Sequence, residues 1–377
     1  MTINNLISSI CIVAVCSPIA GCSQDAWSEA SLHELNISVS NAWKLSERSV
    51  PPPSAASKEQ NQFIRSISAP NPDTRKTSIP STDMEWMKLI ELRESNALKF
   101  NLSELERDFN VRVKTTSVTN VTVYEVFPND YEKYLEDAAL LYLHGGAYVF
   151  NGGIRGVYEA ILISSYTGLR VFSVDYRMPP SHPYPAGLND ALAVYIAIVD
   201  RNPKLKLALG GTSAGASLAV ALTQEIKNRQ LPRPWAVYAG SPWVDLTKTG
   251  DTLFTLEGLD HVLVTYDGVL AAAAKLYAAG LPLGSPLISP IYGEFDEFPP
   301  VYLVTGTRDL LLSDTIRLHR KLKVAGVKVE LNVYEGLSHA EYLRNPASIE
   351  SQQVYLELAQ FLHTALKEHN IEVKYAK

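Results

Sequence analysis

From residue 138 onward, short apolar runs alternate with longer segments that have a helical pattern. Most of the runs contain few polar residues, as is typical of parallel strands that are covered on both faces. The predicted strands are 138–143, 171–174, 205–209, 236–239, 301–304 and 329–333, and the predicted helices are 187–200, 214–228, 314–324 and 348–367. The alternation therefore predicts a doubly wound α/β domain, with a mostly parallel central sheet and helices on both faces.

The chain before this domain changes texture twice. Residues 111–118 and 121–126 are β-branched runs joined by Thr119-Asn120, which predicts an antiparallel hairpin at the start of a domain spanning 110–377. Residues 23–81 are polar and include a Pro/Ser-rich patch, so much of this stretch is predicted to be tether or irregular wrap, within a tether and N-terminal cap region that spans 23–109. Helical spacing begins near Trp86.

The first 22 residues hold all three cysteines, Cys11, Cys16 and Cys22. Residues 6–20 are uncharged and largely apolar, with the length of a signal-peptide core and too short to span a bilayer as a helix. The sequence Ile-Ala-Gly-Cys at 19–22 is similar to the lipobox of bacterial lipoproteins. It predicts an exported protein that is lipidated on Cys22, attached to a membrane of a bacterial envelope and facing the periplasm. The alternatives are a plain secretory signal, giving a secreted or periplasmic protein, or an uncleaved apolar tail.

The charge and the motif content of the chain limit the kinds of partner that it is expected to bind. The chain carries 40 acidic and 34 basic side chains without a long basic run, which argues against nucleic-acid binding. No HExxH, paired-cysteine, Walker or G-x-G-x-x-G motif occurs, so neither a metal nor another cofactor is expected. A small-molecule substrate is the predicted partner.

A G-x-S-x-G motif at 211–215 lies between a predicted strand and a predicted helix. This setting is typical of a nucleophile elbow, a tight turn that exposes a serine at the carboxyl edge of a sheet. Glycines are needed at 211 and 215 because a Cβ there would collide with the neighbouring strand or helix. Ser213 is therefore the candidate nucleophile, and the alternative is a glycine-rich turn with a capping serine.

A second motif, His144-Gly145-Gly146, directly follows the strand predicted at 138–143. Acyl transfer needs preorganised donors for the developing oxyanion. Glycines let backbone N–H groups turn into a site, and the N–H after the nucleophile completes such an oxyanion hole. Gly145, Gly146 and Ala214 are the candidate donors, and an ordinary glycine turn is the alternative.

A serine hydroxyl needs a base, and the base needs an orienting carboxylate. His339 follows the last predicted strand, and Asp309 follows the strand predicted at 301–304. The order Ser213, Asp309, His339 is the order of nucleophile, acid and base in α/β-hydrolases. His182 and His261 are further candidates for the base, but they lie in segments without a matching carboxylate order.

Several motifs together carry a family resemblance. They are His144-Gly145-Gly146, Asp175-Tyr176-Arg177 with Pro185-Ala186-Gly187 and Asp190, the 211–215 motif, Ser241-Pro242-Trp243, Asp309 and His339. Over residues 110–367 the chain resembles the hormone-sensitive-lipase-like branch of the α/β-hydrolases. Residues 306–314 and 334–336 are similar to esterases known as monoterpene ε-lactone hydrolases.

The resemblance implies an α/β-hydrolase fold and an N-terminal helical cap over the acyl pocket, formed from residues 30–105. It also implies an oxyanion hole made by the HGG amides. Two residues depart from the family pattern: Ala147 replaces a third glycine, and Thr212 replaces the aspartate beside the nucleophile.

The sequence thus predicts a metal-independent serine carboxylesterase that hydrolyses short-chain acyl esters or lactones through an acyl-enzyme. Two alternatives stay open, a hydrolase-fold protein that binds ligands without catalysis and a peptidase on the same fold.

Overall fold

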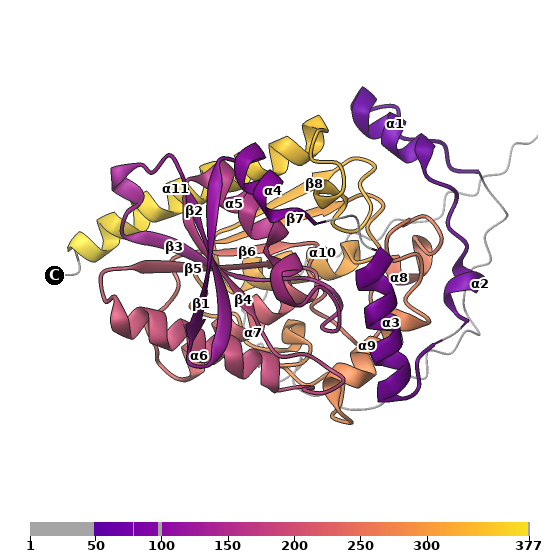
Figure 1. Ribbon diagram of the computed structural model, residues 1–377, viewed down its shortest axis with the longest axis horizontal. Coiled ribbons are helices and arrows are strands. Elements are labelled where there is room, and N and C mark those ends of the chain that lie inside the picture. The colour runs from indigo at the N-terminus through magenta and orange to yellow at the C-terminus, as the bar shows by residue number, and fades with distance from the viewer. Residues whose placement is uncertain (1–48, 78, 97–99, 376–377) are drawn as a thin grey trace, which may run out of the picture. The chain divides into compact units, whose positions relative to one another are not determined.

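The computed structural model describes residues 49–77, 79–96 and 100–375, and Arg48–Lys377 form one compact unit. The predicted signal segment and Cys22 lie outside the described residues. The unit is built on one eight-stranded sheet in the order β1-β2-β4-β3-β5-β6-β7-β8 (Figure 1). Its strands are β1 (Val111–Val118), β2 (Val121–Pro128), β3 (Ala138–Leu143), β4 (Arg170–Asp175), β5 (Lys206–Thr212), β6 (Val237–Gly240), β7 (Val301–Gly306) and β8 (Val329–Tyr334).

Strands β3 to β8 run parallel to one another, whereas β2 is antiparallel to both β1 and β4. The predicted mostly parallel sheet and its entry hairpin are both confirmed. The hairpin turn has Thr119 at φ 51° and Asn120 at φ 67°. Two left-handed central residues are the requirement of a type I′ turn, which matches the twist of a two-residue hairpin.

The two faces of the sheet have separate apolar cores, and β3 contributes to both. Leu141 and Leu143 pack into one core, while Leu140 and Tyr142 pack into the other. All six residues of β3 are buried. This alternation explains the unbroken apolar run in the sequence, because successive side chains of a strand point to opposite faces.

Helices cover both faces (Figure 1). One face is covered by α6 (Ala186–Arg201), α7 (Ala214–Asn228) and α10 (Leu312–Val324), and the other by α5 (Tyr158–Thr167) and α11 (Ile349–Tyr375). Among these five helices, α5 is the one that the sequence pattern did not reveal. It is buried on nearly all sides, which removes the alternation of apolar and polar residues that marks a surface helix.

The N-terminal part of the unit contains α1 (Lys58–Ser66), α2 (Pro72–Arg75), α3 (Asp83–Asn96) and α4 (Leu102–Asp108), and α8 (Thr252–Thr255) and α9 (Val269–Ala278) lie between β6 and β7. Trp86 of α3 packs against Val149 and Phe150, which lie in the loop after β3, and against Ala273 of α9. The expected N-terminal helices are therefore present, and one of them covers the loop after β3. Within the described ranges, no helix has the length and apolar character needed to cross a membrane.

Candidate active site

The turn between β5 and α7 holds Ser213 in a strained conformation, with φ 59° and ψ −122°. Few non-glycine residues adopt positive φ, and a serine in this geometry projects from the sharp strand-to-helix turn. A Cβ on Gly211 would collide with the backbone of Gly215, and one on Gly215 would collide with the carbonyl oxygen of Leu143. Both glycines of the motif are therefore required by the packing of the turn, as the sequence predicted.

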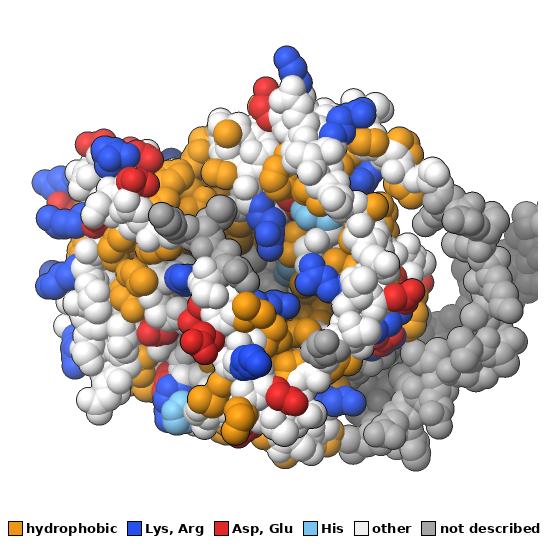
Figure 2. Space-filling view, turned by 45° about the vertical axis from the view of Figure 1, so that its right-hand side comes forward, with side chains coloured by type: hydrophobic (Ala, Val, Ile, Leu, Met, Phe, Trp, Pro, Cys, Tyr) orange, Lys and Arg blue, Asp and Glu red, His pale blue; other side chains and the backbone are white. Residues whose placement is uncertain are grey.

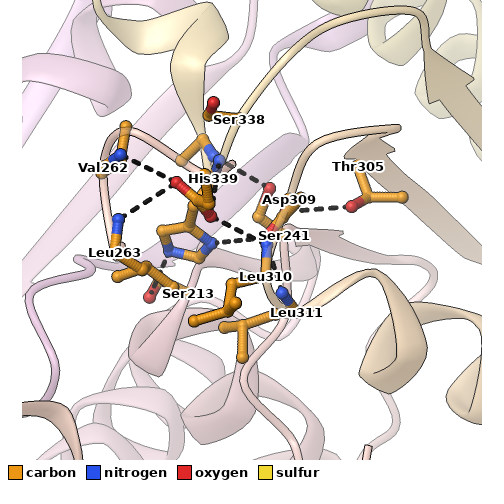
Figure 3. A network of polar contacts seen from close by, with 12 residues as sticks. Ser213, Ser241, Val262, Leu263, Thr305, Asp309, Leu310, Leu311, Ser338 and His339 are labelled. Carbon is orange, nitrogen blue, oxygen red and sulfur yellow. Dashed lines mark hydrogen bonds and ion pairs between the residues drawn. The ribbon is translucent and has the colours of Figure 1, made fainter. Parts of the chain in front are cut away.

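The structure brings Ser213, His339 and Asp309 together at the carboxyl edge of the sheet (Figure 3). His339 Nε2 lies 2.9 Å from Ser213 Oγ, and His339 Nδ1 lies 3.0 Å from Asp309 Oδ1. All three side chains are buried, with exposed fractions of 9% for Ser213, 4% for His339 and 0% for Asp309. A histidine that donates its Nδ1–H to a carboxylate leaves Nε2 free to accept the serine proton.

Asp309 has further donors that fix its carboxylate. Thr305 Oγ1 donates to Oδ2 over 2.9 Å, and the Leu311 amide donates to Oδ1 over 2.8 Å. Burial alone would raise the pKa of Asp309, but the positive charge of His339 and the hydrogen bonds from His339, Ser241 and the Leu311 amide lower it. Burial also opposes protonation of His339, yet the Asp309 carboxylate raises the pKa of that imidazole above its ordinary value.

A second buried carboxylate, Asp260, lies beside the pair and was missed by the sequence analysis. Its Oδ2 accepts the Leu310 amide at 2.8 Å and the His339 amide at 3.3 Å. Its Oδ1 accepts the amides of Val262 at 2.8 Å and Leu263 at 3.1 Å. Burial and repulsion from Asp309 raise the pKa of Asp260 to about 6. Asp260 follows no strand and belongs to no motif, so the sequence gives no signal for it. It is recognised only in the folded chain, where its own loop meets the loops that carry Leu310 and His339.

The other two candidate bases have different surroundings. His261 Nδ1 lies 2.9 Å from Ser338 Oγ, and its ring packs edge-on against Phe63. Burial and the charges of two nearby arginines lower the pKa of His261 to about 4. His182 lines a cleft of about 460 Å³ between α3 and the loop at 178–182. Neither histidine contacts Ser213 in the described structure.

The loop after β3 places its glycines next to the nucleophile. A Cβ on Gly145 would lie 2.8 Å from the Thr212 carbonyl oxygen and 3.3 Å from Ser213 Cβ. Gly146 has φ 125°, a conformation that favours glycine. Within the described part of the chain, the N–H groups of Gly145, Gly146 and Ala214 have no protein acceptor, so they are available to an oxyanion.

His144 makes contacts that hold the loop after β3 in its conformation. Its Nδ1 lies 2.9 Å from the Gly145 carbonyl oxygen, and its ring stacks on Tyr176 with centroids 4.3 Å apart. The Tyr176 hydroxyl donates to the His144 carbonyl over 2.6 Å. Ala147, which replaces the family's third glycine, has φ 52°, so the alanine occupies the left-handed region as well.

Thr212, the other departure from the family pattern, donates to a buried carboxyl group on α5. Its Oγ1 lies 2.8 Å from Glu159 Oε1. Glu159 also accepts hydrogen bonds from the hydroxyls of Tyr142 at 2.5 Å and Tyr238 at 2.6 Å. Thr212 thus ties the elbow to a buried carboxyl group on a neighbouring helix.

Asp175, Arg177 and Asp190 of the family motifs brace the loop after β4. Arg177 pairs with Asp190 through two guanidinium nitrogens, with distances of 2.7 to 3.1 Å, and its amide donates to the same carboxylate over 2.9 Å. Asp175 Oδ1 accepts the Gly153 amide at 2.8 Å. These contacts are structural and do not reach Ser213.

Comparison with known proteins agrees with this geometry. The family model described as the α/β-hydrolase fold matches residues 140–343, which include the glycine loop, the elbow and the segments that carry Asp309 and His339. The chain belongs to the α/β-hydrolase fold family. The predicted fold class is confirmed.

Relatives of this hydrolase are named as an acetyl-hydrolase and an esterase. An acetyl-hydrolase of Streptomyces hygroscopicus is 32% identical over 61% of this chain and 76% of its own length. An esterase of Acinetobacter venetianus is 29% identical over 59% of this chain and 73% of its own length. The hydrolase is therefore an enzyme of the carboxylic ester hydrolase class.

Solved structures support the same grouping. The crystal structure of an esterase called E25 superposes with a TM-score of 0.81 and 40% identity, covering 85% of this chain and 98% of the esterase. An esterase from the bacterial hormone-sensitive lipase family superposes with a TM-score of 0.67 and 27% identity, over 82% of this chain and 99% of its own. The predicted resemblance to that branch is confirmed.

Proposed function

We propose that this hydrolase is a serine carboxylesterase that cleaves short-chain acyl esters or lactones through an acyl-enzyme on Ser213. One observation carries the proposal, the unbroken hydrogen-bond chain from Ser213 Oγ through His339 to Asp309. A nucleophile, a base and an orienting acid within hydrogen-bond reach are the recurring pattern of covalent acyl transfer.

In the first half of the reaction, Ser213 Oγ attacks the ester carbonyl carbon while His339 Nε2 takes the hydroxyl proton. Asp309 holds the imidazole in the required tautomer and stabilises the imidazolium that forms. The N–H groups of Gly145, Gly146 and Ala214 donate to the oxyanion. The C–O bond to the alcohol then breaks, and the leaving oxygen takes the proton from His339.

In the second half, water attacks the acyl carbon and gives its proton to His339. The bond between Ser213 Oγ and the acyl carbon breaks, and Ser213 recovers its proton from His339. The products are an acid and an alcohol. With a lactone both groups stay on one molecule, which leaves as a hydroxy acid.

The proposed substrate class rests on two similarities. The relative from Streptomyces hygroscopicus is named an acetyl-hydrolase, which supports a short acyl group. The motifs at 306–314 and 334–336 are similar to those of ε-lactone hydrolases, which supports a lactone substrate. We therefore expect kcat/KM to be higher for p-nitrophenyl acetate and butyrate than for the octanoate and palmitate, and ε-caprolactone to be opened. A preference for the palmitate ester would contradict the short-chain proposal.

A substitution of Ser213 tests the mechanism. Ser213→Ala should abolish turnover of p-nitrophenyl butyrate and labelling by a fluorophosphonate probe, because it removes the attacking oxygen. Ser217→Ala is the matched control, since Ser217 is a buried serine one turn further along α7 that makes no contact with His339. It should remain labelled. Wild-type protein that neither turns over esters nor reacts with the probe would instead support a ligand-binding protein.

A further inference from the structure

Three arginines from separate elements, here called the rim arginines, lie near the candidate active site: Arg75, Arg93 and Arg344. Arg344 follows the loop that carries His339, and its positive charge acts to lower the pKa of that imidazole. Arg93 is on α3, with its guanidinium carbon 4.2 Å from the ring centroid of Phe150 in the loop after β3. Arg75 ends α2 and packs its carbonyl against Gly268 at the start of α9.

The rim arginines are close enough to repel one another. Partial burial is the largest cause that lowers the pKa of Arg93, and repulsion from Arg75 and Arg344 lowers this pKa further. All three side chains nevertheless reach solvent. Figure 2 shows Lys and Arg side chains around a hollow in which His side chains are visible. The hollow thus concentrates positive charge in a chain whose net charge is −6.

Nearby carboxylates do not neutralise this charge. In the described structure no carboxylate comes within ion-pair distance of a rim arginine. Asp260 and Glu341 attract Arg344, but both are fully buried and engaged elsewhere. Asp260 accepts four backbone amides, and Glu341 accepts the Ser338 amide at 2.6 Å and the amide of the Gln60 side chain.

Glu91 and Glu94 are the acidic residues of α3 that lie nearest to Arg93 in sequence. They line the cleft that α3 forms with the loop at 178–182, together with Met87 and Ile90. Neither is among the charges that shift the pKa of Arg93. Like charges gathered around a hollow favour a ligand of opposite sign, because low-dielectric walls focus the field there.

We propose that the rim arginines bind an anionic group of the substrate, so that the preferred ester carries a carboxylate or phosphate in addition to the ester bond. The inference rests on the proposed ester hydrolysis and names its substrate class more closely. A guanidinium suits this task because it stays charged and presents a planar set of donors that matches carboxylate and phosphate oxygens.

Two pairs of esters of matched size test the proposal and separate the two places where the anion could sit. For the acyl side, 4-nitrophenyl hydrogen adipate is compared with 4-nitrophenyl hexanoate. For the alcohol side, 4-carboxyphenyl acetate is compared with 4-methylphenyl acetate. In the wild type, kcat/KM should favour the anionic member of at least one pair by about tenfold, the usual scale of a hydrogen bond to a charged group.

Removal of one rim charge should cancel this preference. Arg344→Met and Arg93→Met keep most of the side-chain length, and each should lower the anionic-to-neutral ratio of kcat/KM about tenfold, mainly through KM. Arg93→Lys should recover part of the ratio. Arg201→Met, an exposed arginine at the end of α6, is the matched control and should leave the ratio unchanged. Added salt should reduce the wild-type preference through screening.

The assays should be run well above the acidic limb of the pH profile, because loss of Arg344 raises the pKa of His339. If the rim variants lose the anionic preference in only one ester pair, the anionic group lies on the acyl or the alcohol side that this pair represents. An equal ratio in the wild type and the rim variants would overturn the inference, while turnover of neutral esters by Ser213 would leave the proposed function standing. Absence of turnover with all four esters would instead overturn the proposed function.

Discussion

Asp309 and Asp314 are both fully buried, yet they have different partners. Asp309 contacts His339, whereas Asp314 lies in the first turn of α10 and accepts the Asp245 amide at 2.9 Å. Burial and repulsion from Asp245 raise the pKa of Asp314 well above its ordinary value. Asp314 therefore has a structural role, since it accepts the Asp245 amide at the start of α10 and does not contact His339.

This difference predicts unequal effects of the same substitution. Asp309→Asn should lower kcat by about 10⁴, because the imidazole then takes the wrong tautomer. Asp314→Asn keeps an oxygen for the Asp245 amide and should lower kcat less than about tenfold, the scale of one hydrogen bond. Steady-state kinetics and circular dichroism of both variants provide the check. A larger loss of kcat in folded Asp314→Asn would show that the acid is wrongly assigned.

Asp260 acts on His339 through charge, and its removal should appear in the pH profile. His339 must be neutral to accept the Ser213 proton, so kcat/KM rises with pH through the pKa of that imidazole. The Asp260 carboxylate helps to raise this pKa. Asp260→Asn should therefore shift the acidic limb to lower pH.

The shift can be measured by following p-nitrophenol release at its isosbestic wavelength. Asp296→Asn, which removes an exposed carboxylate paired with Lys227, should leave the limb in place. A loss of kcat without a shift would mean that Asp260 only holds the loops together. It would then be a structural residue rather than one that positions the charge of His339.

At the scale of elements, the elbow between β5 and α7 is tied to α5 through Thr212 and Glu159. A strained backbone conformation persists only where the surrounding contacts hold it in place. Because Ser213 has such a conformation, the contacts of the adjacent Thr212 should help to hold it. Thr212→Val removes the hydroxyl with little change of shape, so kcat should fall about tenfold, equivalent to about one hydrogen bond.

The matched control is Thr223→Val on α7. Its buried hydroxyl donates to the Ala219 carbonyl at 2.8 Å within the same helix. That variant loses a local bond of the same kind but leaves the elbow untouched, so its kcat should stay near the wild-type value. Equal kcat in both variants would show that the tie to α5 does not hold the nucleophile.

The elements that the sequence predicted are those with a local signature. β3 could be predicted because both of its faces are apolar, and the elbow because Gly211 and Gly215 are required within one turn. α5 has no such signature, since it is buried all round. Asp260 could not be predicted either, because two of its four donors, the amides of Leu310 and His339, come from other loops that meet it only in the folded chain.

At the scale of the whole molecule, one rule explains why the residues of the candidate site meet. Parallel strands bring their carboxyl ends to one edge, so residues that follow β5, β7 and β8 meet although they are far apart in sequence. The rim arginines lie on α2, on α3 and after β8, and no strand order relates them. Their meeting depends on how the N-terminal helices pack, which no motif encodes.

The last prediction concerns where the enzyme resides. We propose that Cys22, in the lipobox-like sequence at 19–22, is lipidated and anchors the enzyme to a membrane. Each buried CH₂ contributes about 0.8 kcal/mol, so several acyl chains hold a protein far more firmly than one. Wild-type protein expressed in a bacterial host should incorporate labelled palmitate and sediment with membranes, whereas Cys22→Ser should do neither. Cys16→Ser, which changes a cysteine six positions earlier, should behave as the wild type. Wild-type protein that is unlabelled and stays wholly in the soluble fraction would refute the proposed lipid anchor. The segment would then be a plain secretory signal or an uncleaved apolar tail.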